Sequence, residues 1–517
     1  MAQIQGGPAV PVSVVTGGKI KGGKAIPVYG YTSAPTDGRR AAAGPAHPVH
    51  VVSDAQLAAG TFTLEGGPAL PMYVSPSGLS VVGDAAQPVY VVGGSLGGAP
   101  SSLLNALKLY LPLGETGSAT RADSSGNSNH FTATGAPSNG TGKIGSALVS
   151  TSGKYLTRAY TSTLAMHTGN WTISLWYNLT TYAEGKMLYG QWSAAYTFAL
   201  WFYQTFPSIV TSGTPGDIRY FDRMDAIAGD AGAWHHLLIW WDSDAGLLWV
   251  MRDNKNLKSF TQTAITTNTT DPISIGALGS GTNGFEGLLD EIAFWQRKLT
   301  ASEMAYLYAN GNANAYPFTS QAITQKQIVC DGDSLTEGYP KTTTWAQSYP
   351  GQLDTAYSGA NAVRNVGVSG KAISQLLTDA ATKFDWLYAT VYAKNICVIW
   401  AGINDILLLN RTAAAIYADL VTYCQARQAV GWQVVICTLT PSQYSGQPVD
   451  TQTRIDTINT NIRNNYTDYA DGLADLAAEA NLSDPTNTTY FNADKLHLKD
   501  AGQAIVETTV KAVIDAL

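Results

Sequence analysis

Charged side chains are scarce in this chain: Asp, Glu, Lys and Arg make up 13% of its 517 residues, about half the usual share. Acidic residues outnumber basic ones and give a formal net charge of -7, and no run of Lys and Arg occurs. Such a chain lacks the positive field that attracts a polyanion. We therefore expect no nucleic-acid partner.

Cysteine is absent until position 330. The four cysteines are Cys330, Cys397, Cys424 and Cys437, and their spacing matches no zinc-binding pattern. Three of them lie within apolar runs, so we expect buried free thiols rather than disulfides. This pattern is typical of a protein that folds in a reducing cytoplasm before its release.

Long apolar runs are also lacking. No run approaches the roughly 18–20 residues that a bilayer-spanning helix needs, so no membrane insertion is expected. The first residues, MAQIQGGPAVPV, show no basic start followed by an apolar core, and we expect no signal peptide. A protein of this kind that acts outside a cell would leave it by lysis, by dedicated secretion, or within a virus particle.

A chain of this length predicts about three domains. In its first part, residues 1–98, a short phrase recurs, for example GGPAVPVSVV (6–15) and GGPALPMYVS (66–75). Each repeat joins a Gly/Ala/Pro turn to a Val- or Tyr-rich strand signal, with proline where no ladder donor is needed. Units this short cannot bury a core alone, so stacked β-repeats are favoured over a flexible linker.

These phrases resemble the short Gly-Gly-Pro-Ala-x-Pro-Val repeats of tailed-bacteriophage structural proteins. The resemblance implies an anchoring segment that binds virion structural proteins through residues 1–98. It places the protein on a phage tail or capsid appendage, or otherwise outside the cell. By analogy with such appendages, we expect a homotrimer.

Residues 103–318 have the pattern of an all-β domain. In the segment WTISLWYNL, apolar side chains alternate so that Trp171, Ile173, Leu175, Tyr177 and Leu179 share one face. Farther along, Asp-Asn at 253–254 predicts a hairpin turn between two apolar strands. Many short strands with polar turns indicate a two-sheet sandwich or jelly roll.

The stretches LYLPLGE (109–115), AWHHLLIWWD (233–242) and FEGLLDEIAFWQRKLTASEMAYLYANG (285–311) resemble the concanavalin A-like, laminin-G-type jelly roll. The resemblance implies a lectin-like domain that binds sugars, sometimes with Ca²⁺, or one that serves as a spacer. An inward-facing core accounts for most aromatic residues at 171–206, and glycan stacking is the alternative. Asp123 and Asp290 are the candidates to lie near a cation, but no dense loop of oxygen ligands occurs. We assign no metal site.

From residue 322 to 517 the pattern changes. Apolar runs such as QIVCD (327–331) and NICVIWAG (395–402) alternate with helical stretches such as 412–430 and 500–516. This alternation predicts a parallel sheet covered by helices on both faces. In such sheets, ligands bind beyond the carboxyl ends of the strands.

Four motifs occur in order, each at the end of a strand or at the start of a helix. Ser334 follows the first strand in Gly-Asp-Ser-Leu, Gly370 lies in a loop after the second, and Asn404 follows the third. Asp494 and His497 precede the last helix and could form an acid–imidazole pair. Each motif alone has an ordinary explanation as a turn, a loop glycine, a helix cap or a loop histidine. The ordered set is what indicates a catalytic site.

Together these motifs resemble the SGNH (GDSL) hydrolase superfamily and imply a flavodoxin-like three-layer α/β fold. The resemblance implies a serine esterase in which Ser334 is the nucleophile, His497 the base and Asp494 its orienting partner. The backbone N–H groups of Ser334 and Gly370 and the side chain of Asn404 would form the oxyanion hole. No cofactor is required.

Three neighbours, Asp333, Ser369 and Asp405, are interpreted as structural supports rather than participants. The sequence departs from the family pattern at Leu498, where many members have proline after the histidine. We do not expect this difference to change the mechanism.

The substrate follows less directly. A jelly roll beside an esterase favours a carbohydrate ester, and no apolar lid for a lipase stands out. We therefore expect an O-acetyl esterase that acts on a bacterial surface polysaccharide from a phage appendage. One alternative is a receptor-binding appendage with no catalysis, since fold does not guarantee activity. The other is a secreted bacterial acetylxylan-type esterase.

Overall fold

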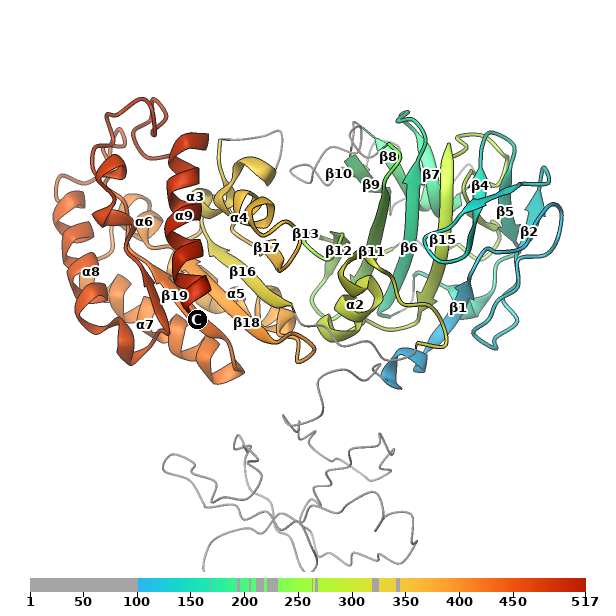
Figure 1. Cartoon of the computed structure of the whole chain (residues 1–517), viewed down its shortest axis with the longest axis horizontal. Coiled ribbons are helices and arrows are strands. Elements are labelled where there is room, and N and C mark those ends of the chain that lie inside the picture. Colours follow the sequence, from blue (N-terminus) through green and yellow to red (C-terminus); the bar gives the residue numbers. More distant parts are fainter. Residues whose placement is uncertain are drawn as a thin grey trace, which may run out of the picture. The chain divides into compact units, whose positions relative to one another are not determined.

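A computed structural model describes residues 101–517, apart from 168, 193–195, 204–205, 211–217, 221–230, 263, 266–267, 319–324 and 341–344. The repeats predicted over 1–98 lie outside the described residues. Within them, an all-β sandwich precedes an α/β domain with a parallel sheet (Figure 1). The predicted fold class, a jelly-roll region followed by a flavodoxin-like domain, is confirmed for this part of the chain.

One sheet of the sandwich contains eight strands. They are β1 (Leu107–Leu111), β3 (Asn139–Thr141), β4 (Ser146–Ser150), β6 (Trp171–Leu179), β11 (Trp234–Asp242), β12 (Leu247–Arg252), β13 (Asn256–Thr261) and β15 (Gly287–Trp295). Their order is β13-β12-β11-β6-β15-β4-β3, and β1 also pairs with β15. All of these pairings are antiparallel.

The facing sheet contains seven strands. They are β2 (Thr132–Thr134), β5 (Tyr155–Arg158), β7 (Lys186–Trp192), β8 (Tyr196–Tyr203), β9 (Phe206–Val210), β10 (Ile218–Tyr220) and β14 (Ile273–Ile275). Their order is β10-β9-β8-β7-β14-β5-β2. Non-consecutive neighbours in both sheets are typical of a jelly roll.

The core of the sandwich lies between the two sheets. Alternate residues of β6, namely Trp171, Ile173, Leu175, Tyr177 and Leu179, are all fully buried in it. The face predicted from the period-2 pattern is therefore confirmed. Among the described aromatic residues of 171–206, the core contains Trp171, Tyr177, Tyr189, Phe198 and Phe202, as expected, because their rings bury a large apolar area.

The predicted turn between β12 and β13 is also confirmed. Asp253 and Asn254 have φ angles of 52° and 58°, the left-handed values that a tight hairpin turn of this type requires at both central positions. Arg252 pairs with Asn256 directly beyond the turn.

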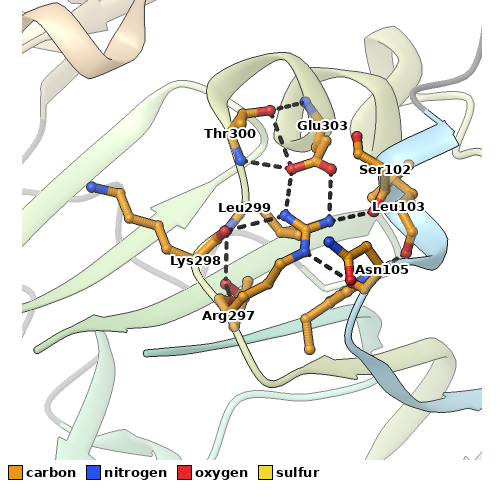
Figure 2. Close-up of polar contacts among 10 residues, drawn as sticks. Ser102, Leu103, Asn105, Arg297, Lys298, Leu299, Thr300 and Glu303 are labelled. Carbon is orange, nitrogen blue, oxygen red and sulfur yellow. Dashed lines mark hydrogen bonds and ion pairs between the residues drawn. The ribbon is translucent and has the colours of Figure 1, made fainter. Parts of the chain in front are cut away.

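A short helix, α2 (Ala301–Tyr308), follows β15 and is held by an ion pair between buried Glu303 and partly buried Arg297 (Figure 2). Thr300 and Glu303 form a reciprocal capping box at its start. The carboxylate of Glu303 also accepts two hydrogen bonds from the guanidinium of Arg297, at 2.8 and 2.6 Å. Arg297 donates further to the carbonyls of Ser102 and Asn105. One side chain thus joins the helix to the first residues of the sandwich.

The α/β domain is built on five parallel strands. They are β16 (Lys326–Gly332), β17 (Ala362–Asn365), β18 (Lys394–Trp400), β19 (Gln433–Cys437) and β20 (Gly472–Ala474). The order β17-β16-β18-β19-β20 is that of flavodoxin-like folds. The strands are buried almost throughout, which explains their continuous apolar sequence.

Seven helices of this domain are described. They are α3 (Ser334–Glu337), α4 (Tyr349–Tyr357), α5 (Ile373–Lys383), α6 (Ile403–Leu407), α7 (Ala413–Val430), α8 (Thr451–Asn465) and α9 (Asp500–Ala516). Helix α4 packs with α9, and α7 packs with both α5 and α8, so that helices cover both faces of the sheet (Figure 1). All four cysteines are buried and unpaired, as predicted.

The sandwich and the α/β domain belong to one unit of structure. Trp240 and Trp249 stack on each other on the outer face of β11 and β12, and Trp386 of the α/β domain packs its edge against both at 5.3 Å. The fully buried Arg364 of β17 donates to the backbone and side-chain oxygens of Asn254 at the hairpin tip. No helix within the described ranges is long and apolar enough to span a bilayer.

We predict that Glu303→Ala lowers the free energy of unfolding by about 2–4 kcal/mol, because it removes the charged hydrogen bonds from Arg297 and uncaps α2. Urea denaturation measures the change. As a control, Lys383→Ala removes one lysine from a surface pair with Asp379 and should cost about 0.5 kcal/mol or less. Equal losses in the two variants would contradict the prediction.

Candidate active site

The nucleophile candidate lies in a sharp turn between β16 and α3. Asp333 is the N-cap of α3, and its side chain accepts a hydrogen bond from the N–H of Leu335 at 2.9 Å. Gly332 has a φ of 154°, and a Cβ atom there would lie 2.2 Å from the carbonyl oxygen of Trp400 on β18. Only glycine fits this close approach, and it places Ser334 at the edge of the sheet.

The structure brings Ser334, His497 and Asp494 into one hydrogen-bonded chain. Nε2 of His497 lies 2.9 Å from Oγ of Ser334, and Nδ1 lies 2.7 Å from Oδ2 of Asp494. Ser334 and His497 are far apart in the sequence but in contact in the fold. Both residues are more than nine-tenths buried. The distances match those of a serine nucleophile, its base and the orienting acid.

The acid is fixed by its own loop. Oδ1 of Asp494 accepts the backbone N–H groups of Leu496 and His497, at 3.1 and 3.0 Å. Partial burial alone would raise the pKa of Asp494, but the hydrogen bonds from His497 and Leu496 outweigh it, and the pKa lies below its ordinary value. An ionised carboxylate only accepts hydrogen bonds, so Nδ1 carries the imidazole proton and Nε2 is free to accept the serine proton.

The predicted oxyanion-hole residues Gly370 and Asn404 line the same pocket as Ser334. Gly370 has a φ of 80°, and open space surrounds the position where a Cβ would lie, so its backbone faces the pocket without a side chain. Asn404, in the first turn of α6, donates one Nδ2 hydrogen to the carbonyl oxygen of Lys371 at 3.0 Å. An amide has two such hydrogens, which leaves the second for a substrate oxygen.

Asp405 and Ser369 act as supports, as the sequence suggested. Buried Asp405 accepts the N–H of Ile373 at 2.8 Å and an N–H of Arg411 at 2.7 Å, and so anchors the start of α5. Ser369 donates its backbone N–H to Glu337 at 2.9 Å. Both contacts hold the loop that contains Gly370.

These residues border a pocket with a volume of about 200 Å³. Its lining residues are Ser334, Tyr339, Ser369, Gly370, Asn404, Leu407, Leu408, Tyr444, Ser445, Gly446, Gln447, Leu496 and His497. All the predicted site residues line it except Asp494, which lies behind His497. Sequence reasoning missed Tyr339, the leucines of α6 and the loop at 444–447. Tyr339 closely follows the Gly-Asp-Ser motif and so had a signal, whereas the loop had none.

Comparison with known proteins agrees with this geometry. Residues 330–505 match the GDSL-like Lipase/Acylhydrolase family. The C-terminal domain is a GDSL-like hydrolase domain. It acts on ester substrates. Residues 150–305 match the Concanavalin A-like lectin/glucanases superfamily, which agrees with the jelly roll. No curated protein shows significant similarity to the chain.

Several solved structures are similar to part of the chain. A GDSL-family lipolytic protein from Veillonella parvula is 19% identical, covering 37% of this chain and 100% of its own, with a TM-score of 0.30. The esterase EstA from Pseudoalteromonas sp. is 15% identical, covering 37% and 97%, with a TM-score of 0.30. Domain 4 of the arabinanase AbnA from Geobacillus stearothermophilus, in complex with arabinotriose, is 19% identical, covering 38% and 95%, with a TM-score of 0.32.

The two carboxylates considered for calcium do not fit a cation site. Asp123 accepts the backbone N–H groups of Tyr110, Ser125 and Asn129, and Asp290 accepts those of Ile144 and Glu291. Their oxygens are thus occupied by amide donors. Within the described ranges, no three His, Cys, Asp or Glu side chains gather where they could hold a metal.

Two buried carboxylates, Asp331 and Asp333, shortly precede the nucleophile of the GDSL domain in the chain. Burial, together with the nearby charges of Asp405 and Asp331, raises the pKa of Asp333 to about 7. Burial also raises the pKa of Asp331 to about 6, although the Tyr423 hydroxyl donates to it. Oδ2 of Asp333 has no hydrogen-bond partner among the residues that the structure describes. The folded domain therefore favours the neutral form of Asp333 in mildly acidic solution.

We predict that Asn404→Ala lowers kcat of ester hydrolysis by about 10²–10³-fold, because one donor to the oxyanion is lost. KM should change little, since the donor acts mainly in the transition state. Steady-state kinetics with a nitrophenyl ester measures both. A rise in KM at unchanged kcat would show that Asn404 binds the ground state instead.

The buried Asp333 should make stability depend on pH. Its folded pKa, about 7, exceeds its ordinary value of 3.8. Between these values the unfolded carboxyl is ionised while the folded one keeps its proton, so this group lowers stability as pH rises through the window and adds no further change above it. An asparagine at this position would cap α3 equally well. Asp333→Asn should therefore gain about 1–4 kcal/mol relative to the native chain between pH 4 and pH 7, measured by urea denaturation. A difference that does not vary with pH would contradict this.

Proposed function

We propose that the protein is a serine esterase that removes acetyl groups from a bacterial surface polysaccharide, as part of a phage tail or capsid appendage. The observation that carries the proposal is the chain from Ser334 through His497 to Asp494 at the wall of a small pocket. This geometry supports the serine-esterase step. The substrate and the location are further parts of the proposal and have separate support.

The reaction follows from the positions of the atoms. His497 Nε2 removes the proton of Ser334 as Oγ attacks the ester carbonyl, and the carbonyl oxygen becomes an oxyanion facing Gly370 and Asn404. The protonated imidazole, stabilised by Asp494, then gives its proton to the departing alcohol, which leaves an acyl-enzyme. Water, deprotonated by His497, attacks this ester and releases the acid and the free serine.

The size of the pocket favours a short acyl group. Its volume, about 200 Å³, is below the roughly 300–1,000 Å³ of pockets that enclose drug-sized ligands. An acetyl group fits beside Ser334 with room for part of the alcohol. A long acyl chain would extend beyond the pocket onto the surface.

Aromatic rings at the pocket mouth favour a sugar as the alcohol. Tyr339 and Tyr444 line the pocket and are 41% and 40% exposed. Rings exposed in this way offer apolar faces and a polar hydroxyl to a carbohydrate. On the jelly roll, Trp192 and Trp201 are only half-buried, with ring centroids 5.3 Å apart. Among the described residues of the jelly roll, this pair of rings is our candidate for contact with a glycan.

The location rests on the sequence. The repeats of residues 1–98 resemble those of phage structural proteins, and few surface charges suit a virion protein. Attachment to virion proteins, the trimer and the virion location therefore belong to the proposal. A secreted acetylxylan-type esterase is the alternative location for the same chemistry.

A second candidate substrate, a longer-chain ester, is favoured by one observation. Leu408 and Leu409 are 63% and 50% exposed at the end of α6, and Leu408 lines the pocket. Exposed leucines of this kind could hold an acyl chain that leaves the pocket. No apolar lid was expected from the sequence, but these leucines provide an apolar border.

Hydrolysis of nitrophenyl esters from acetate to dodecanoate separates the candidates. We predict that the native protein prefers acetate and that Ser334→Ala lowers kcat by about 10⁴–10⁶-fold. Acetate release from O-acetylated bacterial polysaccharides, compared with release from acetylxylan, then identifies the alcohol.

Each contrary result has a definite meaning. A preference for long chains would replace the carbohydrate ester with a lipid ester. Activity that survives in Ser334→Ala would refute the assigned site. Turnover no greater than that of the mutant on every ester would favour a binding appendage without catalysis.

A further inference from the structure

Glu337 joins the nucleophile's helix to the loop of the oxyanion hole. It is the last residue of α3, which begins at Ser334. One of its oxygens, Oε2, accepts both the backbone N–H of Ser369, at 2.9 Å, and the hydroxyl of the same residue. Ser369 directly precedes Gly370, so the carboxylate holds the peptide that supplies the amide donor.

The loop that contains Gly370 depends on such contacts, because glycine has no side chain whose packing could fix the backbone. Its φ of 80° and the open space around its Cβ position leave it without side-chain packing, and glycine has the widest choice of backbone conformations. After Gly370, the loop is held by Asn404 at Lys371 and by Asp405 at Ile373. Before Gly370, Glu337 anchors the adjacent residue.

The second oxygen of Glu337 faces the jelly roll. Nζ of Lys258, on β13, lies 3.8 Å from Oε1, and the Glu337 side chain is only 11% exposed. A lysine ammonium this close to a poorly solvated carboxylate attracts it, and hydrogen bonds to a carboxylate are stronger than those to a neutral acceptor.

Lys258 is held in place by the hairpin that bears it. At the tip, Asn254 receives two hydrogen bonds from Arg364, and its Nδ2 donates to the hydroxyl of Tyr392 at 2.6 Å. Next to it, Lys255 lies 2.6 Å from Asp354 of α4. These contacts fix β13 against the α/β domain.

We propose that Glu337 is a positioning residue for the oxyanion hole and that Lys258 of the jelly roll keeps it in place. The jelly roll is then part of the catalytic apparatus as well as a neighbouring domain. This inference rests on the proposed serine-esterase mechanism. Glu337 touches no reacting atom, and it acts through Ser369 on the amide of Gly370.

The first test removes the carboxylate in the full-length protein. Glu337→Ala should lower kcat for nitrophenyl acetate by about 10–10²-fold, less than the full loss of an oxyanion donor, with KM within about twofold. Inactivation by a nitrophenyl phosphonate, which places a charged oxygen in the same hole, should slow by a similar factor. Glu337→Gln keeps an acceptor oxygen and should recover most of the lost activity.

The second test asks whether Lys258 works through Glu337. Lys258→Met should lower kcat by about 2–5-fold in the native background, and it should have no further effect when combined with Glu337→Gln, because the charge it pairs with is gone. Lys186→Met is the matched control, since it breaks a lysine–glutamate pair of the same length, 3.8 Å to Glu286, elsewhere on the jelly roll. Its kcat should equal that of the native protein.

Contrary outcomes are distinct from failure of the proposed function. Ser334→Ala first shows whether turnover comes from this site. If it does, an unchanged kcat in Glu337→Ala overturns the positioning role. An equal loss in Glu337→Gln and Glu337→Ala, together with a lower thermal midpoint in both, would mean a merely structural role and also overturns it. Additive losses from Lys258→Met and Glu337→Gln would overturn the part assigned to Lys258.

Discussion

The parallel sheet of the GDSL domain imposes the constraint on which its site depends. Parallel strands end at the same edge, so the segments that leave β16, β17 and β18 meet there. Ser334, Gly370 and Asn404 each follow one of these strands. Asp494 and His497 come from the loop before α9. Helix α9 contacts the nucleophile's helix, because the side chain of Gln503 donates a hydrogen bond to the carbonyl of Leu335. Residues far apart in the chain therefore share one pocket.

The contact between the two described domains limits which surfaces of the jelly roll are open to a ligand. Stacked tryptophans on the outer face of β11 and β12 would be obvious candidates for sugar binding, but Trp386 covers them. The hairpin at Asn254 inserts toward the buried Arg364. A buried guanidinium that loses its hydrogen-bond partners costs free energy. These contacts therefore favour a fixed arrangement of the two domains over a jelly roll that is joined only by a linker. A glycan would have to bind elsewhere on the sandwich.

Much of this could be predicted from local pattern. Alternation identified β6, and the Asp-Asn pair identified the hairpin turn, because side-chain period and left-handed φ values are properties of short segments. Continuous apolar runs identified β16 and β18. Short elements were missed: β20 has three residues, and α3 and α6 are each about one turn long. Segments this short have too little periodicity to be recognised, and they form because the surrounding fold positions them.

By itself, the sequence determined the class of each described domain and the identity of the candidate catalytic residues. Both depend on periodicity and on short motifs, which can be recognised without a structure. Only the tertiary structure decided which other residues reach them. No sequence pattern predicts the contact of Glu337 with Ser369, that of Lys258 with Glu337, or the place of Tyr444 at the pocket. Their roles depend on distances across the sheet edge and between domains, which are set by the packing of the whole chain.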